Sequence, residues 1–159
     1  MNQGLSKESL LFLDFDGVIR THRSITNKAE FKDGVDFDCV NQLNRIVKTT
    51  KAKIVFSTSW RPPARGLAKI NRLINSWGVE AEGIGCTPWL NLDKPFTFAS
   101  RGEEIAAWFS LNGLKEDEQK FVIIDDEDDM ETLGQYLIHC TFEQGLTKEL
   151  ADEAITRLI

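Results

Sequence analysis

Acidic and hydroxyl side chains follow three short apolar segments of this chain, at the point where each segment ends. The three groups are Asp14 and Asp16 after 10–13, Ser57, Thr58 and Ser59 after 53–56, and Asp125 and Asp126 after 121–124. Carboxylates can act as nucleophiles, as general acids and bases, or as ligands of a cation. If the fold brings the three segment ends together, the chain has the side chains for nucleophilic and acid–base catalysis.

The three segments are continuous apolar runs, which is typical of strands buried on both faces of a parallel sheet. Apolar residues at helical spacing, or helix caps, predict helices over 38–49, from Pro62-Pro63 to about Trp77, over 100–111 and from Thr147 onward. Two further short strands are expected over 79–84 and 136–140. Because strands alternate with helices, we predict an α/β fold in which helices flank a mostly parallel sheet.

Parallel strands place their carboxyl ends at one edge of the sheet, where open α/β sheets bind ligands. Several carboxylates gathered there repel one another, and a bound hard cation would relieve that repulsion. Oxygen-only ligation, with no histidine or cysteine nearby, favours Mg²⁺ over zinc or copper. A site with carboxylates, Mg²⁺ and a hydroxyl donor suits phosphoryl transfer.

The composition is that of an ordinary globular protein, with 42% hydrophobic and 28% charged residues, and the 159 residues are expected to form one domain over 1–159. No apolar run approaches the ~20 residues needed to span a bilayer, and the polar start is unlike a signal peptide. We therefore expect a cytoplasmic location and no membrane partner. The net charge of −6 argues against a general nucleic-acid binder.

The segment 11–18 (LFLDFDGV) resembles the first motif of the haloacid dehalogenase (HAD) superfamily, an apolar strand followed by DxDG and then Val or Thr. The segment 55–59 (VFSTS) is similar to the second motif, a strand that ends in Thr or Ser. The segment 121–126 (FVIIDD) is similar to the fourth, a strand that ends in an acidic pair. Three motifs in the right order are far more specific than one. The resemblance spans residues 10 to about 130 and implies a Rossmann-like, HAD-like fold.

The resemblance also implies a role for each matching carboxylate. Asp14 would be the nucleophile, forming an aspartyl-phosphate, and a metal ligand. Asp16 would be the general acid and base, with its backbone carbonyl as a metal ligand. Asp126 would hold Mg²⁺, with Asp125 or Asp129 acting directly or through water.

The second and third motifs leave two alternatives each. Thr58 would hydrogen-bond the transferring phosphoryl group, with Ser57 as the alternative because the register at this strand end is uncertain by one residue. The third motif is a lone cation. Lys94 precedes a proline, as the family lysine often does, whereas Arg101 lies closer to the expected distance before the fourth motif. Arg101 also begins a predicted helix, where a cation is electrostatically unfavourable, so a functional reason is indicated and Arg101 is preferred.

Four more residues are candidates for substrate binding because they end or follow the motifs. Ser59 ends the second motif, Trp60 and Arg61 follow it, and Arg20 follows the first. Cations at the rim of the site would attract an anionic substrate. Trp60 would either stack on a base or ring of the substrate or pack within the protein.

Members of the superfamily often carry a cap domain after the first or second motif, but the intervals here leave room only for a short flap, about 19–37. An open site admits large substrates, and capless members often act on phosphorylated nucleic-acid ends or proteins. The combination of 59–61 (SWR), 101–105 (RGEEI) with Trp108, and the acidic pair 125–126 resembles in particular the HAD domains associated with RNA repair.

The preferred hypothesis is a Mg²⁺-dependent phosphomonoester hydrolase that acts on a nucleic-acid end or a nucleotide. One alternative is a phosphoprotein phosphatase, for example for phosphotyrosine, which would share the catalytic core and differ at the rim. A second alternative is a catalytically silent module that binds phosphate or a partner, against which the intact pair of Asp14 and Asp16 argues. No obligate protein partner is inferred.

Overall fold

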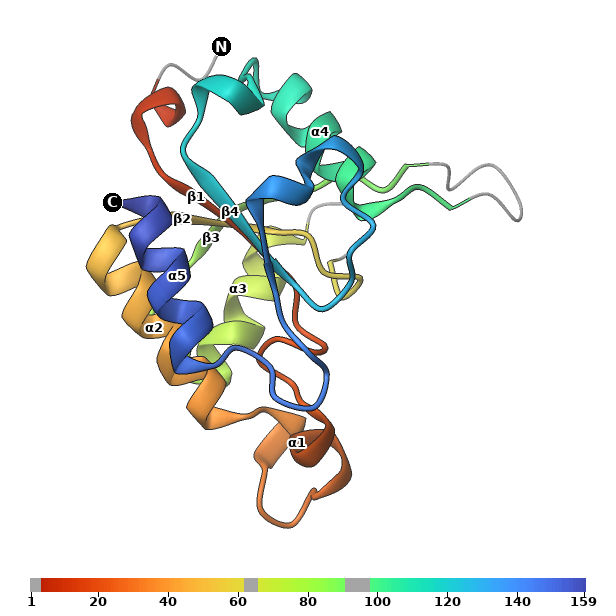
Figure 1. Cartoon of the computed structure of the whole chain (residues 1–159). Coiled ribbons are helices and arrows are strands. Elements are labelled where there is room, and N and C mark those ends of the chain that lie inside the picture. The colour runs from red at the N-terminus through yellow and green to blue at the C-terminus, as the bar shows by residue number, and fades with distance from the viewer. Residues whose placement is uncertain (1–3, 62–65, 91–97) are drawn as a thin grey trace.

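A five-stranded parallel sheet forms the centre of the computed structural model, which describes residues 4–61, 66–90 and 98–159 (Figure 1). The sheet order is β3-β2-β1-β4-β5, so the first strand lies in the middle. The strands are β1 (Leu10–Leu13), β2 (Lys53–Phe56), β3 (Gly83–Cys86), β4 (Phe121–Asp125) and β5 (Leu137–His139). The predicted α/β fold with a parallel sheet is confirmed.

Helices cover both faces of this sheet. They are α1 (His22–Thr26), α2 (Phe37–Thr50), α3 (Leu67–Ser76), α4 (Arg101–Leu111) and α5 (Lys148–Leu158). Helices α2, α3 and α5 pack on one face, and α4 packs on the other (Figure 1). No cap domain is inserted in the described part of the chain, as the sequence predicts.

The central strand is apolar along its whole length because each of its faces meets a helical layer. Side chains of a strand alternate between the two faces of the sheet. Leu11 and Leu13 pack with the layer of α2, α3 and α5, whereas Leu10 and Phe12 pack with α4. All four side chains are fully buried.

Two predicted strands have different bounds in the structure. The strand expected over 79–84 begins only at Gly83, because Val79 still belongs to the end of α3: its N–H donates to the carbonyl of Ile74, and Gly78 adopts a left-handed conformation with φ of 92°. The strand expected over 136–140 is shorter, 137–139, because Tyr136 ends a 3-10 turn.

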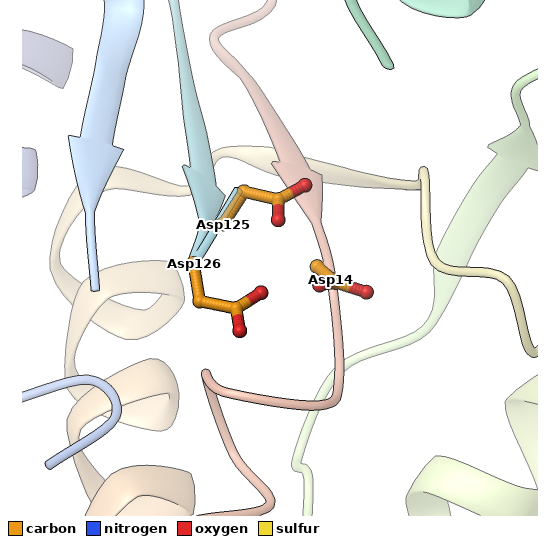
Figure 2. Close-up of side chains that lie close together, drawn as sticks. All are labelled: Asp14, Asp125 and Asp126. Carbon is orange, nitrogen blue, oxygen red and sulfur yellow. The ribbon is translucent and has the colours of Figure 1, made fainter. Parts of the chain in front are cut away.

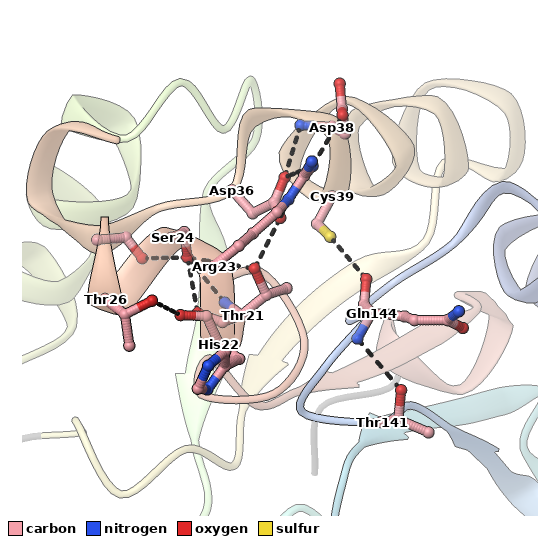
Figure 3. A network of polar contacts seen from close by, with 11 residues as sticks. Thr21, His22, Arg23, Ser24, Thr26, Asp36, Asp38, Cys39, Thr141 and Gln144 are labelled. Carbon is pink, nitrogen blue, oxygen red and sulfur yellow. Dashed lines mark hydrogen bonds and ion pairs between the residues drawn. The ribbon is translucent and has the colours of Figure 1, made fainter. Parts of the chain in front are cut away.

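The flap predicted over 19–37 contains α1 and is held by a polar network around the buried carboxylate of Asp36 (Figure 3). Arg23 donates from Nε and Nη2 to the carboxylate of Asp36 at 2.7 and 2.8 Å, and it also contacts Asp38 at 2.9 Å. The hydroxyl of Thr21 donates to Asp36 at 2.7 Å, and that of Ser24 to the carbonyl of Gly34 at 2.7 Å. Burial acts to raise the pKa of Asp36, but the hydrogen bonds from Arg23 and Thr21 outweigh it and lower that pKa.

The other side of the flap is tied to the loop that follows β5. The N–H of Leu146 donates to the carbonyl of Val18 at 2.8 Å, and the N–H of His22 donates to that of Phe142 at 2.9 Å. The flap is therefore attached on two sides and forms a fixed rim. Among the described helices, none has the length and apolar character needed to cross a bilayer.

Candidate active site

The register of the three central strands places the motif residues side by side. Leu13 pairs with Phe56 on β2 and with Ile124 on β4. The next residues along the three strands are Asp14, Ser57 and Asp125. The N–H of Ser57 donates to the carbonyl of Leu13, and that of Asp14 to the carbonyl of Ile124, so the ladder continues one step beyond β1 and β2.

The alternation of side chains puts these three residues on the same face of the sheet. Leu13, Phe56 and Ile124 all belong to the core under α2, α3 and α5. One residue further along each strand, the side chains turn to the opposite face. That is the face covered by α4, which begins at Arg101.

Three carboxylates form a cluster at this edge of the sheet (Figure 2). One oxygen each of Asp14, Asp125 and Asp126 can be chosen so that all three atoms lie within 4.8 Å of one another. Figure 2 shows the carboxylates of Asp125, which ends β4, and of Asp126, which follows it, close to that of Asp14. Hard oxygen donors at this spacing fit a small divalent cation.

The proximity of these carboxylates changes their affinity for protons. Burial, and then the negative charge of Asp14, raise the pKa of Asp125 to about 8, while Arg101 opposes that rise. Burial and the same neighbouring charge also raise the pKa of Asp126. The cluster therefore has more negative charge than the surrounding protein stabilises, which is the electrostatic condition for binding a cation.

Arg101 joins the three strand ends. Its Nε lies 3.1 Å from Oδ2 of Asp125, its Nη2 lies 3.9 Å from Oδ1 of Asp14, and its Nη1 donates to the carbonyl of Ser57. The side chain is only 14% exposed, so these contacts are little screened by water. Arg101 is thus placed as the third-motif cation would be, whereas Lys94, the alternative, lies outside the described residues.

The hydroxyls of the second motif differ in their surroundings. The Oγ of Ser57 is buried and has no hydrogen-bond partner among the described residues. The Oγ1 of Thr58 accepts from the N–H of Trp60 at 3.2 Å. The free hydroxyl beside Asp14 is therefore that of Ser57, so the geometry favours the alternative over Thr58. Ser59 is exposed at the rim.

The carboxylate of Asp16 lies outside the acidic cluster. It accepts from Arg20 and, at 2.9 Å, from Nε1 of Trp60, and its side chain is 43% exposed. The guanidinium of Arg20 lies 4.6 Å from the centroid of the Trp60 ring, which is itself 40% exposed. Trp60 therefore lies at the rim, whereas the Arg20 side chain is only 15% exposed, and both contact the predicted general acid.

The prediction that Arg61 lies at the rim is wrong. Arg61 is 2% exposed, and its Nη2 forms an ion pair with Oε2 of Glu104 at 2.7 Å. Burial acts to lower the pKa of Arg61, and the charge of Glu104 opposes that effect. The guanidinium also lies 3.9 Å from the centroid of the Trp89 ring. A buried, fully engaged guanidinium is not available to a substrate.

Sequence reasoning missed Glu104 and the role of Asp129. Glu104 is 7% exposed, and its position four residues before Trp108 puts it on the apolar face of α4, which is the signal that could have revealed it. Asp129 was the alternative to Asp125 as a second residue at the metal, and its carboxylate accepts from the N–H of Arg101 at 3.1 Å. It therefore helps to fix the first turn of α4.

The comparisons with known proteins assign the family. A model of the family described as the HAD domain in Swiss Army Knife RNA repair proteins matches residues 10–151. The match covers most of the chain, and the chain belongs to this family. Comparisons with curated proteins and with solved structures give no match.

Proposed function

We propose that this protein is a Mg²⁺-dependent phosphomonoester hydrolase that acts through an aspartyl-phosphate. The observation that carries the proposal is the convergence of Asp14, Asp125, Asp126, Arg101 and the free hydroxyl of Ser57 at the carboxyl edge of the sheet. A nucleophile, a set of oxygen ligands and two groups that bind a phosphoryl oxygen are the parts that phosphoryl transfer requires. Membership of a HAD family supports the same class of reaction.

In the first step an oxygen of Asp14 attacks phosphorus, and the bond between phosphorus and the ester oxygen of the substrate breaks. The departing oxygen takes a proton from Asp16, which must be protonated when the substrate binds. Arg101 and Ser57 lie where they can donate hydrogen bonds to the transferring phosphoryl group. The products of this step are the released alcohol and phosphorylated Asp14.

In the second step water attacks the phosphorus of the aspartyl-phosphate and gives a proton to the Asp16 carboxylate. The bond between phosphorus and Asp14 breaks, inorganic phosphate leaves, and both carboxyl groups return to their initial states. Mg²⁺ held by Asp14, Asp125 and Asp126 would neutralise charge on the phosphoryl oxygens.

The substrate that we propose is large or exposed, such as a phosphorylated nucleic-acid end or a nucleotide. Its support is the lack of a cap domain in the described part of the chain, together with the exposed ring of Trp60 beside Asp16. A π-face at the rim can stack on a base. The description of the family refers to RNA repair proteins, which agrees with this substrate class.

The test of this function is the hydrolysis of a generic aryl phosphate by the wild-type chain with Mg²⁺, by the wild type with EDTA, and by Asp14→Asn. We expect turnover only in the first sample, because the amide is a poor nucleophile and a weaker metal ligand. Turnover by Asp14→Asn at the wild-type rate would exclude Asp14 as the nucleophile.

An inactive wild type calls for a second measurement, the Mg²⁺-dependent formation of a beryllofluoride complex at Asp14, followed by ¹⁹F NMR. A complex that forms in the wild type and not in Asp14→Asn supports the nucleophile and indicates a demanding substrate. If neither protein forms it, the catalytically silent module is the better description. With an active enzyme, competition between 5′- or 3′-phosphorylated oligonucleotides and phosphotyrosine peptides separates the two substrate classes.

A further inference from the structure

The buried guanidinium of Arg61 uses every one of its five N–H donors. Nε donates to the carbonyl of Thr87 at 2.9 Å, and Nη1 donates to the carbonyls of Ser57 and Thr58 at 3.0 and 2.8 Å. Nη2 donates to the carbonyl of Pro88 at 3.3 Å and pairs with Glu104 at 2.7 Å. Only an arginine has five donors in a fixed plane, so lysine cannot reproduce this set.

These acceptors belong to three different parts of the site. Ser57 and Thr58 end β2, Thr87 and Pro88 follow β3, and Glu104 lies in the first turn of α4. The sheet ladder ends at Ser57 and Thr87, so the carbonyls of Ser57, Thr87 and Pro88 need a donor from outside the sheet. The Arg61 side chain supplies that donor and thereby joins the three parts.

The arginine of the third motif shares one of these acceptors. The carbonyl of Ser57 accepts from Nη1 of Arg61 and also from Nη1 of Arg101. Two guanidinium groups that meet at one oxygen repel each other. Glu104 lies three residues after Arg101 on the same helix and places a negative charge on Arg61, so it makes the close approach of the two cations tolerable.

We infer that Arg61 and Glu104 are positioning residues that hold Ser57 and Arg101 in register with Asp14. They act through the carbonyl of Ser57 and the first turn of α4, and neither touches the substrate. The inference rests on the proposed function for its kinetic consequence, but its structural consequence can be measured without activity. The buried ion pair of Arg61 and Glu104 would then act by positioning other residues. Buried ion pairs in general contribute little to stability.

The first variant is Arg61→Lys, which keeps the charge beside Glu104 but provides three donors in place of five. The hydrolysis of an aryl phosphate with Mg²⁺ is the kinetic readout. We expect kcat to fall about tenfold or more, because a small misplacement of catalytic groups is costly, while KM changes by less than about threefold. Arg45→Lys is the matched control, since Arg45 pairs with Asp152 between α2 and α5, far from the chemistry, and it should leave kcat unchanged.

The second readout is the exchange of the Arg101 Nε–H with solvent, measured by ¹⁵N-resolved NMR and assigned by its absence in Arg101→Lys. In the wild type Nε lies 3.1 Å from Oδ2 of Asp125 in a side chain that is only 14% exposed, so its N–H should exchange slowly because water has little access. We expect exchange to accelerate about tenfold in Arg61→Lys and in Glu104→Gln, and to stay the same in Arg45→Lys. Glu104→Gln has nearly the same shape as the native residue, so it provides the result if Arg61→Lys fails to fold.

The outcomes separate this inference from the proposed function. Unchanged exchange at Arg101 in folded Arg61→Lys or Glu104→Gln would overturn the inference, whatever the activity. If the wild type neither hydrolyses the aryl phosphate nor forms the beryllofluoride complex, the proposed function fails, and accelerated exchange still supports the positioning role. A variant that only lowers the melting temperature, with kcat and exchange as in the wild type, would show that the pair has a structural role alone.

Discussion

Ser57 and Thr58 of the second motif carry adjacent hydroxyls that face opposite sides of the sheet. Because Ser57 follows Phe56, which pairs with Leu13, its side chain lies on the α4 face together with that of Asp14. Thr58 follows on the other side and accepts a hydrogen bond from Trp60. The two hydroxyls therefore have separable tasks that single substitutions can distinguish.

We predict that Ser57→Ala lowers kcat for phosphate ester hydrolysis by about 10²-fold, the usual loss for one donor to a developing oxyanion. Thr58→Val, which removes the other hydroxyl, should lower the free energy of unfolding by about 1 kcal/mol and change kcat little. Steady-state kinetics and urea denaturation of both variants provide the check. A larger loss of kcat in Thr58→Val than in Ser57→Ala would restore Thr58 as the phosphate-binding hydroxyl.

A second prediction at the residue scale concerns Asp16 and the leaving group. If Asp16 protonates the departing oxygen, Asp16→Asn should slow an alkyl phosphate by at least about tenfold more than a nitrophenyl phosphate, because the nitrophenolate leaves without a proton. The ratio of the two kcat/KM values, in wild type and variant, is the measurement. Equal losses on both substrates would argue against the role of general acid.

At the scale of elements, the start of α4 is fitted against the loop after β4. Gly102 lies so close to this loop that a Cβ at its position would approach the carbonyl oxygen of Met130 to 2.1 Å. The N–H of Gly102 donates to the carbonyl of Asp129, and the side chain of Ser100 caps the helix. The position of Arg101 over the acidic cluster therefore depends on a glycine next to it.

Gly102→Ala should push the first turn of α4 away from the sheet and lower the free energy of unfolding by about 1 to 3 kcal/mol, the usual cost of overpacking. We also expect a loss of activity, because Arg101 would move with the helix. Gly134→Ala is the control, since nothing lies within 4 Å of a Cβ there. If Gly102→Ala has the free energy of unfolding and the kcat of the wild type, as Gly134→Ala should, the close fit at Gly102 is refuted.

The fixed rim formed by 19–37 has its own pH dependence. The pKa of Asp36 is lowered in the folded protein below its ordinary value of 3.8. A lowered pKa contributes stability that is present above 3.8 and is lost as the pH falls through the folded-state pKa. The carboxylate of Asp36 thus helps to hold the rim at neutral pH but not in acid.

We predict that Asp36→Asn destabilises the chain by about 1 to 3 kcal/mol at pH 7, the range for hydrogen bonds to a buried charged group. The difference from wild type should shrink as the pH falls below about 4, because Asp36 then becomes protonated in the unfolded chain before it does in the folded wild type. Urea unfolding at several pH values measures it. A difference that does not change between pH 7 and pH 3 would mean that the charge of Asp36 is not what holds the rim.

At the scale of the whole molecule, metal binding and stability are coupled through the acidic cluster. With a pKa of about 8, Asp125 is mostly protonated at pH 7 in the metal-free protein and ionised in the unfolded chain. A raised pKa contributes stability that is present below the unfolded-state value and is lost as the pH rises through about 8. The free energy of unfolding of the metal-free protein should therefore fall as the pH rises through about 8.

Mg²⁺ should reverse this trend, because binding requires the ionised carboxylates. We expect the affinity for Mg²⁺ to rise between pH 6 and about pH 8 and then level off. A concentration of 100 times the dissociation constant should stabilise the fold by about 2.7 kcal/mol. Calorimetric melting with and without Mg²⁺ tests this, with Asp126→Asn as the variant that weakens binding. Equal affinity at pH 6 and pH 8 would contradict the coupling.

Local pattern was enough to predict most of the elements. The apolar runs that precede Asp14, Ser57 and Asp125 predicted three of the strands and the edge where the motif residues meet, because the length of an apolar run and the residue that ends it can be seen in the sequence itself. The helix at Arg101 and the cap by Thr147 also follow from local rules. The strand at 79–84 was misplaced because a helix cap and a short strand look alike in sequence.

The tertiary structure alone decided which side chains face one another. Sequence could not choose between Ser57 and Thr58, because a shift of one residue in register turns a side chain to the opposite face. Nor could it show that Arg61 is buried, since an arginine next to a catalytic motif is usually exposed and is buried only where a partner such as Glu104 neutralises it. Pairing across strands and burial of charge depend on contacts between distant segments, and those contacts exist only once the sheet and α4 have packed together.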